Sequence, residues 1–207
     1  MKSLLCASVA LTGALCVAAP VEAASIIVNG SFEDGTDGPG GSWVTLQAGN
    51  ASLTGWTITA GSIDWIGGLW QPHSGARSVD LHGNSAGTLA QSFATDIGQQ
   101  YLVSFWMAGN PDGSPEEKTV RVTSGDAAES FSFMLGPGIS RQNMGWEQRS
   151  FTFTALAATS TLTFFSTSTG VFYGAALDDV AVTAVPEPGV LALLGSALAP
   201  FLRRRRR

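Results

Sequence analysis

Cysteine is nearly absent from this chain of 207 residues, and both cysteines, Cys6 and Cys16, lie in an apolar segment close to its first residue. Residues 24–185 can therefore form neither disulfides nor thiolate metal sites. Histidine is scarce as well, with His73 and His82 alone, so a zinc site is not expected. This segment must be stabilised by a packed core, to which a hard metal ion such as calcium could add.

Basic residues are also rare in the middle of the chain. Residues 24–185 contain five Lys and Arg residues against 14 Asp and Glu residues, which gives a net charge of −9. Residues 203–207, in contrast, are five consecutive arginines, so the overall charge of −5 combines two segments of opposite sign. An acidic domain of this kind repels phosphate, which argues against a nucleic-acid partner and against anionic lipid.

The first 23 residues have the three parts of a secretory signal peptide. Lys2 supplies the positive start, residues 4–19 are apolar, and a cleavage site of small residues ends at Ala23. A first transmembrane helix is the alternative, but Gly13 and Pro20 interrupt the run. We expect a signal helix over residues 1–23, removed by signal peptidase during export through the inner membrane of a Gram-negative-type bacterium.

Residues 186–207 combine Pro186, Glu187 and Pro188 with an apolar run over 189–202 and the arginine cluster. About 20 apolar residues are needed to span a bilayer comfortably, so this short run is marginal as a permanent anchor. The arginines would stay on the cytoplasmic side. The three parts in this order resemble the PEP-CTERM sorting signal, which implies processing by an exosortase. The expected course is transient anchoring in the inner membrane, then delivery to the cell surface or extracellular matrix. A plain membrane anchor is the alternative.

Residues 24–185 are predicted to form one all-β domain. Short runs of alternating apolar and polar residues recur between turn sequences, and helical periodicity is lacking. The predicted strands cover residues 26–28, 55–59, 63–66, 77–81, 88–93, 101–108, 119–124, 130–134, 149–154, 160–166 and 177–183. Many short strands at this spacing favour a jelly-roll β-sandwich, here flanked by the signal helix and a short C-terminal apolar helix.

Several sequence motifs carry a resemblance to a known family. The domain opens on Asn29-Gly30-Ser31-Phe32-Glu33 and closes on Ala176-Leu177-Asp178-Asp179-Val180, with Phe105-Trp106-Met107-Ala108-Gly109-Asn110-Pro111 between them. Together they resemble the bacterial choice-of-anchor C family, whose members often end in a PEP-CTERM tail. The resemblance implies a galactose-binding-like jelly roll, the fold of many carbohydrate-binding modules. It says little about function, because one fold serves many functions.

A calcium site is predicted where the two ends of the domain meet. If Val180 and Val182 face the core, two-residue alternation places Asp178 on the same inward face and Asp179 on the outer one. A buried carboxylate needs a cation, an arginine or several amide donors. The resemblance to carbohydrate-binding jelly rolls implies a structural Ca²⁺ held by Glu33 and Asp178. An arginine partner or backbone hydrogen bonds, without a metal, remain the alternative.

A sugar-binding surface is predicted in the segment after residue 62. Sugars stack their apolar faces on exposed aromatic rings while polar groups bind their hydroxyls. The candidates are Trp65, Trp70, Gln71 and His73, with Arg77 and Asn110 near the same rim. Trp70 is expected to be exposed, because a Gly-Gly pair precedes it and a proline follows. The remaining candidates for aromatic platforms, Trp56, Trp106 and Trp146, are expected in the core.

Enzymatic signatures are thin. Residues 83–87 match Gly-x-Ser-x-Gly, but both histidines precede Ser85, and a hydrolase triad requires the histidine to follow it. A glycosidase carboxylate pair has no sequence spacing by which it could be recognised. We therefore expect a protein that is not an enzyme and that binds extracellular polysaccharide. A structural matrix protein without a defined ligand and, less favoured, a glycan-active enzyme are the alternatives.

Overall fold

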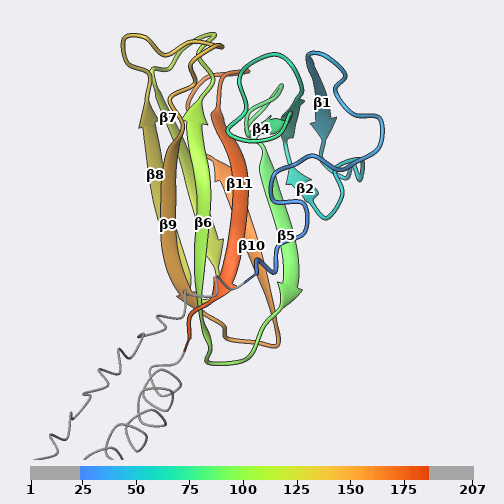
Figure 1. The fold of residues 1–207 in the computed structure, drawn as a ribbon, viewed down its shortest axis with the longest axis vertical. Coiled ribbons are helices and arrows are strands. Elements are labelled where there is room, and N and C mark those ends of the chain that lie inside the picture. The colour runs from blue at the N-terminus through green and yellow to red at the C-terminus, as the bar shows by residue number, and fades with distance from the viewer. Residues whose placement is uncertain (1–23, 187–207) are drawn as a thin grey trace, which may run out of the picture.

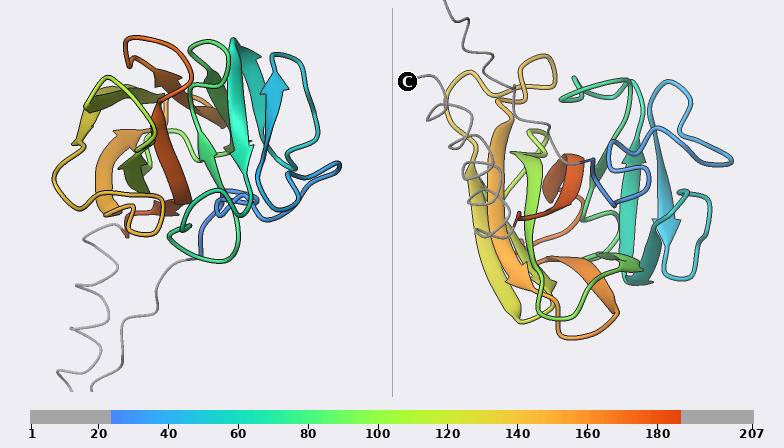
Figure 2. Two further views of the ribbon diagram at one scale, coloured as in Figure 1. Left: turned by 90° about the horizontal axis from the view of Figure 1, so that it is seen from above. Right: turned by 60° about the horizontal axis from the view of Figure 1, so that its bottom comes forward.

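The computed structural model describes residues 24–186 of the chain, which form a two-layer all-β sandwich. One sheet has six strands in the order β1-β3-β4-β11-β6-β9, and the other has five in the order β2-β5-β10-β7-β8. All neighbouring strands are antiparallel. The sheets lie face to face when viewed from above (Figure 2). Within the described range, no helix is long and apolar enough to cross a membrane.

The strand boundaries follow the alternation of the sequence closely. They are β1 Trp43–Gln47, β2 Thr57–Ala60, β3 Ser62–Ile66, β4 Ser78–Asp80, β5 Thr88–Ala94, β6 Gln100–Gly109, β7 Glu117–Ser124, β8 Ala127–Met134, β9 Glu147–Thr154, β10 Thr159–Ser166 and β11 Ala175–Ala184. Each predicted run except 26–28 overlaps one of these strands. The all-β prediction is therefore confirmed for the described residues.

Two details of the strand prediction are wrong. Residues 26–28 are not a strand, although Ile26 N donates to Val182 O at 2.9 Å beside β11. Strand β1 was not predicted, although Val44 and Leu46 alternate with polar residues in it. The predicted signal helix over 1–23 and the apolar helix in 189–202 lie outside the described residues, as do Glu187 and Pro188. Pro186 is the last described residue and is exposed.

The core lies between the two sheets and is mostly aromatic and aliphatic. Phe105 of β6 packs edge-on against Phe164 of β10, with ring centroids 5.2 Å apart. Phe32 and Trp56 close one side at 5.3 Å. Burial of such large rings is the main source of stability in a domain without disulfides. Figure 1 shows β6, β9 and β11 side by side across the front of this core, with β1 to β4 beside them.

Loops cover part of the outer face of the six-stranded sheet. Trp70 lies over β4, where its Nε1 donates to Ser78 Oγ at 2.9 Å. The segment 73–77 covers β11 through hydrogen bonds to Asp178, which is fully buried. Across β11, β6 and β9, farther from these loops, outward side chains such as Leu102 and Ser150 are exposed. The candidate site lies on this outer surface.

Candidate functional site

A shallow groove of about 480 Å³ lies on the outer face of β11, β6 and β9. It is lined by Ser25, Leu102, Ser104, Gln148, Ser150, Ala181 and Thr183. None of these residues is charged, and most carry a hydroxyl or an amide. The groove therefore offers hydrogen-bonding groups along its length without a strong charge of either sign.

The strand register explains why the groove is shallow and open. Ala181 of β11 lies opposite Ser104 of β6, which lies opposite Ser150 of β9. Opposite residues in an antiparallel sheet present their side chains on the same face. Three small side chains thus form one row across the sheet, and this row leaves room above it for a ligand.

The groove ends at an aromatic cluster. Trp106 is the next outward residue of β6 after Ser104 and lies opposite Gln148 of β9. The His73 ring stacks on Trp106 with centroids 3.8 Å apart and ring planes 16° from parallel. Trp146 meets the His73 ring edge-on at 6.4 Å, and its Nε1 donates to Gln71 O at 3.0 Å. Trp106, Trp146 and His73 are each partly exposed, so this cluster forms a wall at the end of the groove.

Two neighbouring carboxylates hold His73 in this position. Asp179 Oδ2 lies 2.5 Å from His73 Nδ1, and its Oδ1 accepts a hydrogen bond from Ser74 Oγ at 2.7 Å. Asp178 Oδ2 accepts from the backbone N–H groups of His73 and Ser74 at 2.9 and 3.1 Å. Burial raises the pKa of Asp178 to about 7, and these amide donors oppose the shift.

A β-bulge decides which face each aspartate takes. Asp178 lies opposite the outward Trp106, and Ala181 lies opposite Ser104, so β11 has one residue more than β6 between these pairs. Asp179 adopts the left-handed conformation in the bulge, with φ of 45°. The prediction that Asp178 points inward with Val180 is therefore wrong, because the extra residue inverts the alternation. Asp178 is nonetheless fully buried, since the 73–77 loop covers it from outside.

Glu33 holds the same loop from its other end. Its Oε1 accepts from the backbone N–H groups of Ala76 and Arg77 at 2.8 and 2.9 Å. A Cβ on Gly75 would lie 2.3 Å from this oxygen, and the φ of Gly75 is +59°, so both the space and the conformation require glycine there. The two carboxylates predicted as metal ligands thus both hold the 73–77 loop.

The fit of a calcium ion to Glu33 and Asp178 can be judged from these contacts. Calcium takes six to eight oxygen ligands, several of them commonly carboxylates. Within residues 24–186, no group of three or more His, Cys, Asp or Glu side chains is arranged to hold a metal. A calcium ion here would have to share both carboxylates with backbone amides and draw most of its oxygens from the backbone or water. Binding of calcium by Glu33 and Asp178 stays a prediction.

The predicted sugar-contacting residues divide into two groups. Trp65 is fully buried and its Nε1 donates to Phe32 O, while Trp70 is 4% exposed. The expectation that Trp70 is exposed is therefore wrong, because its loop folds back and hydrogen-bonds it to Ser78. A buried ring has no free face on which a sugar could stack. Gln71 and His73 do lie at the aromatic cluster beside the groove.

Sequence reasoning missed Trp106, although the signal was present. Tyr101, Val103, Phe105 and Met107 share the inward face of β6, so alternation alone places Trp106 outward. Trp106 and Trp146 were expected in the core and are partly exposed instead, whereas Trp56 is buried as expected. Neither of the two other rim candidates reaches the groove. The Arg77 guanidinium lies 4.6 Å over the Trp65 ring, and Asn110 is buried against Asp80.

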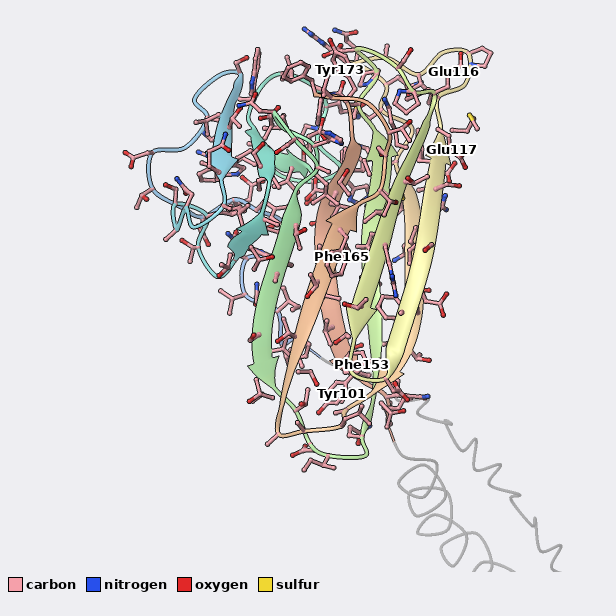
Figure 3. All side chains as sticks on the ribbon, turned by 180° about the vertical axis from the view of Figure 1, so that it is seen from behind. Tyr101, Glu116, Glu117, Phe153, Phe165 and Tyr173 are labelled. Atoms are coloured by element: carbon pink, nitrogen blue, oxygen red, sulfur yellow. The ribbon has the colours of Figure 1, made fainter. Side chains whose placement is uncertain are left out.

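A second polar cluster is buried at the end of the sandwich remote from the chain termini. Asp80 is fully buried and accepts hydrogen bonds from Asn110 Nδ2 and from the backbone N–H groups of His82 and Gly174. Lys118 is also fully buried, and its Nζ donates to Gly113 O and Tyr173 O. Figure 3 shows Tyr173 at this end, near Glu116 and Glu117. This cluster joins the loops at that end of the sandwich.

Comparisons with known proteins give a family and a distant relative. The family described as "Protein of unknown function (DUF642)" matches residues 25–183. Halomucin of Haloquadratum walsbyi is 28% identical over 170 residues, which is 79% of this chain and 2% of Halomucin. The chain thus spans a very small part of that relative's length, and the properties of the whole relative do not transfer to it.

Solved structures resemble the sandwich only loosely. TmCBM61 in complex with β-1,4-galactotriose has a TM-score of 0.45 at 12% identity, covering 78% of this chain and 99% of that one. CBM35 from Paenibacillus barcinonensis has a TM-score of 0.44 at 18% identity, covering 69% and 99%. An arabinose-bound MgGH51 α-L-arabinofuranosidase reaches 0.49 at 13% identity, covering 78% and 26%. This likeness does not locate a ligand site on the chain.

Proposed function

This chain belongs to the DUF642 family, and from the groove on its sandwich we propose its function: non-catalytic binding of an extracellular polysaccharide. The observation that carries the proposal is an uncharged groove, lined with hydroxyl and amide groups, that ends against the partly exposed Trp106. The pairing of polar rim and aromatic wall suits a sugar, which has hydroxyls at its edges and apolar C–H faces.

The chemistry of the groove favours a neutral glycan. The lining residues carry no cation to pair with uronic acid or sulfate groups, and the domain as a whole has a net charge of −9. Gln148 and the three hydroxyls of Ser104, Ser150 and Thr183 offer both donors and acceptors to sugar hydroxyls. Trp106 offers the aromatic surface at the end of the row.

Delivery to the polysaccharide is part of the same proposal. The chain is exported by its first 23 residues and sorted by Pro186, Glu187 and Pro188 as a choice-of-anchor C protein with a PEP-CTERM tail, with exosortase and signal peptidase as processing partners. The inner membrane holds it transiently, before it reaches the cell surface or matrix. Cell fractionation with an antibody against residues 24–185 tests this course, since a cytoplasmic product would refute it.

A blocking substitution tests the groove. Calorimetry with neutral polysaccharides such as β-galactan, xylan and β-glucan, and with polygalacturonate as an anionic comparison, identifies a ligand for the wild-type protein. In Ser104→Trp a large ring fills the groove without touching the core, so binding should fall at least about tenfold. Thr161→Trp is the matched control, because Thr161 is exposed on the outward face of β10 in the other sheet.

Trp106→Ala tests the aromatic wall. Loss of one aromatic contact is worth roughly 0.5–1.5 kcal/mol, so affinity should fall about tenfold at most. Trp43→Ala is the control, because Trp43 is 51% exposed on the edge strand β1. Thermal unfolding of each variant checks that the fold is kept. If the wild-type protein binds none of the polysaccharides, the structural matrix role becomes the better account.

A further inference from the structure

Two aliphatic side chains protrude from the end of the sandwich where the chain enters and leaves. Ile97 is 72% exposed in the loop between β5 and β6, and Leu156 is 67% exposed in the loop between β9 and β10. They are the most exposed large hydrophobic residues of the described range. Exposed apolar side chains point to an interaction site where they lie together on one surface.

The two loops are held together as one surface. Gly98 N donates to Ala155 O at 2.8 Å, and Ala155 N donates to Gln99 O at 3.0 Å. Thr95 N donates to Ala158 O at 3.0 Å on the far side of the same pair. Beneath them the rings of Tyr101 and Phe153 stack 5.4 Å apart, at the lower end of the sandwich in Figure 3. Ile97 and Leu156 therefore project from a rigid base.

The chain leaves the domain beside this surface. Val185 N donates to Gln100 O at 2.9 Å, and Gln99 Nε2 donates to Val185 O at 2.7 Å. The apolar run begins at Gly189, four residues later. Four extended residues span at most about 14 Å. The apolar run can therefore begin no farther than this from Val185, which is hydrogen-bonded to Gln99 in the loop that carries Ile97.

We propose that this end of the sandwich rests on the membrane. While the segment 189–202 is anchored, Ile97 and Leu156 insert into the interfacial layer of the bilayer and orient the domain. The inference rests on the proposed anchoring and adds the surface that contacts lipid. Membrane interfaces accept protruding aliphatic side chains, and the nearby anchor gives the loops a high effective concentration at the surface.

The charged residues at this end of the sandwich favour a membrane of zwitterionic lipid over one of anionic lipid. The three connections at this end, 95–99, 125–126 and 155–158, contain Asp96 and Asp126 and no Lys or Arg. Anionic headgroups would repel these aspartates. The groove on the β11-β6-β9 face would then lie along the side of the anchored domain, open to the surroundings.

A fluorescent label tests the contact. The chain without the proposed signal peptide, residues 24–207, contains no cysteine of its own; it is given a single cysteine by Ala157→Cys, next to Leu156, and labelled with an environment-sensitive dye. The matched control is Asn84→Cys in the exposed connection between β4 and β5, at the opposite end of the sandwich. Each protein is reconstituted with phosphatidylcholine vesicles and separated by flotation. We expect a blue shift of the dye at residue 157 and none at residue 84.

Further variants and lipids sharpen the outcome. Ile97→Ser with Leu156→Ser should abolish most of the blue shift while the chain still floats with the vesicles. Vesicles containing phosphatidylglycerol should give a smaller shift than pure phosphatidylcholine. Flotation without any shift at residue 157 would overturn the inference and leave the anchoring intact. Failure to float would refute the anchoring and the inference with it. A shift without vesicles that grows with protein concentration would assign the surface to a second copy of the chain.

Discussion

Two aspartates on the outer face of the six-stranded sheet, Asp80 and Asp178, are both fully buried but in different ways. Asp80 of β4 lies opposite Ala176 of β11, and Asp178 follows two residues farther along the same strand. Asp80 is covered by the loops around Asn110 and Gly174, whereas Asp178 is covered by the 73–77 loop. Neither forms an ion pair in the described structure.

The difference lies in the surroundings of the hydrogen-bond donors. The donors to Asp80 come from Asn110, His82 and Gly174, and all three of these hydrogen bonds are buried. The donors to Asp178 are the backbone N–H groups of His73, Ser74 and Asp179, which are all partly exposed residues. Buried donors cannot turn to water when their acceptor is lost, whereas donors in a surface loop can. Asp80 therefore supports the fold, and Asp178 positions His73 beside the groove.

Asp80→Ala should have the largest effect on stability. It leaves three donors without a partner in the interior, which should lower the free energy of unfolding by about 3–5 kcal/mol. Asp178→Ala exposes its three donors, which lie in partly exposed residues, to water and should cost only about 1–2 kcal/mol. Urea unfolding monitored by tryptophan fluorescence measures both, with the exposed Glu129→Ala as a control that should stay within about 0.5 kcal/mol. If both substitutions lowered the free energy of unfolding equally, Asp80 and Asp178 would not differ in their contribution to the fold.

The pH dependence of stability sharpens the same comparison. Burial raises the pKa of Asp80 to about 8 and that of Asp178 to about 7 from the ordinary 3.8, so the folded state holds protons that the unfolded chain has released. Stability should therefore fall as pH rises from about 4 to 8. Burial lowers the pKa of Lys118 from 10.5 to about 8, so the folded state releases its proton first and stability should rise between these values.

A minimum of stability near pH 8 is the expected result, because the carboxyls of Asp80 and Asp178 lower stability as the pH rises to that value and Lys118 raises it above that value. Thermal unfolding midpoints between pH 4 and pH 10 measure it. Asp178→Asn removes one titrating carboxyl, so it should flatten the fall below pH 7 and leave the rise above pH 8 in place. A profile that climbs steadily from pH 4 to pH 8 would contradict the burial of both aspartates as neutral acids.

Local alternation made the strands predictable from the sequence. Side chains on a strand alternate between faces whatever the rest of the chain does, so β6 could be assigned from Val103, Phe105 and Met107. The same rule, applied to Trp106, places it on the outer face, where the candidate site lies; the expectation from the sequence that this tryptophan is in the core was wrong. Lys118 alternates with Val120 and Val122 on β7, which is the only local sign that this lysine is buried.

Contacts between distant segments were not predictable in this way. The bulge that turns Asp178 outward fits against Gly30, where a Cβ would lie 1.9 Å from Val180 O, and Val180 N donates to Gly30 O at 2.9 Å. Trp70 is buried because Ser78 lies under its loop. These arrangements depend on which segments come into contact in the folded domain. The spacing of residues along the chain does not predict such contacts.

The response to calcium separates the two aspartates by ligand instead of by stability. If the predicted ion binds at Glu33 and Asp178 and is supplied at 100 times its dissociation constant, it adds about 2.7 kcal/mol to stability. Chelation should then lower the unfolding midpoint of the wild-type protein. Glu33→Gln keeps an oxygen for the amides of Ala76 and Arg77 but removes the charge, so it should abolish the response to chelator at little other cost. Asp80→Asn is the control that should keep the response to chelator, because Asp80 lies in the other cluster.

An unchanged wild-type midpoint would mean that the amides of the 73–77 loop alone balance the Glu33 and Asp178 carboxylates. The loop beside the groove would then be held without a metal.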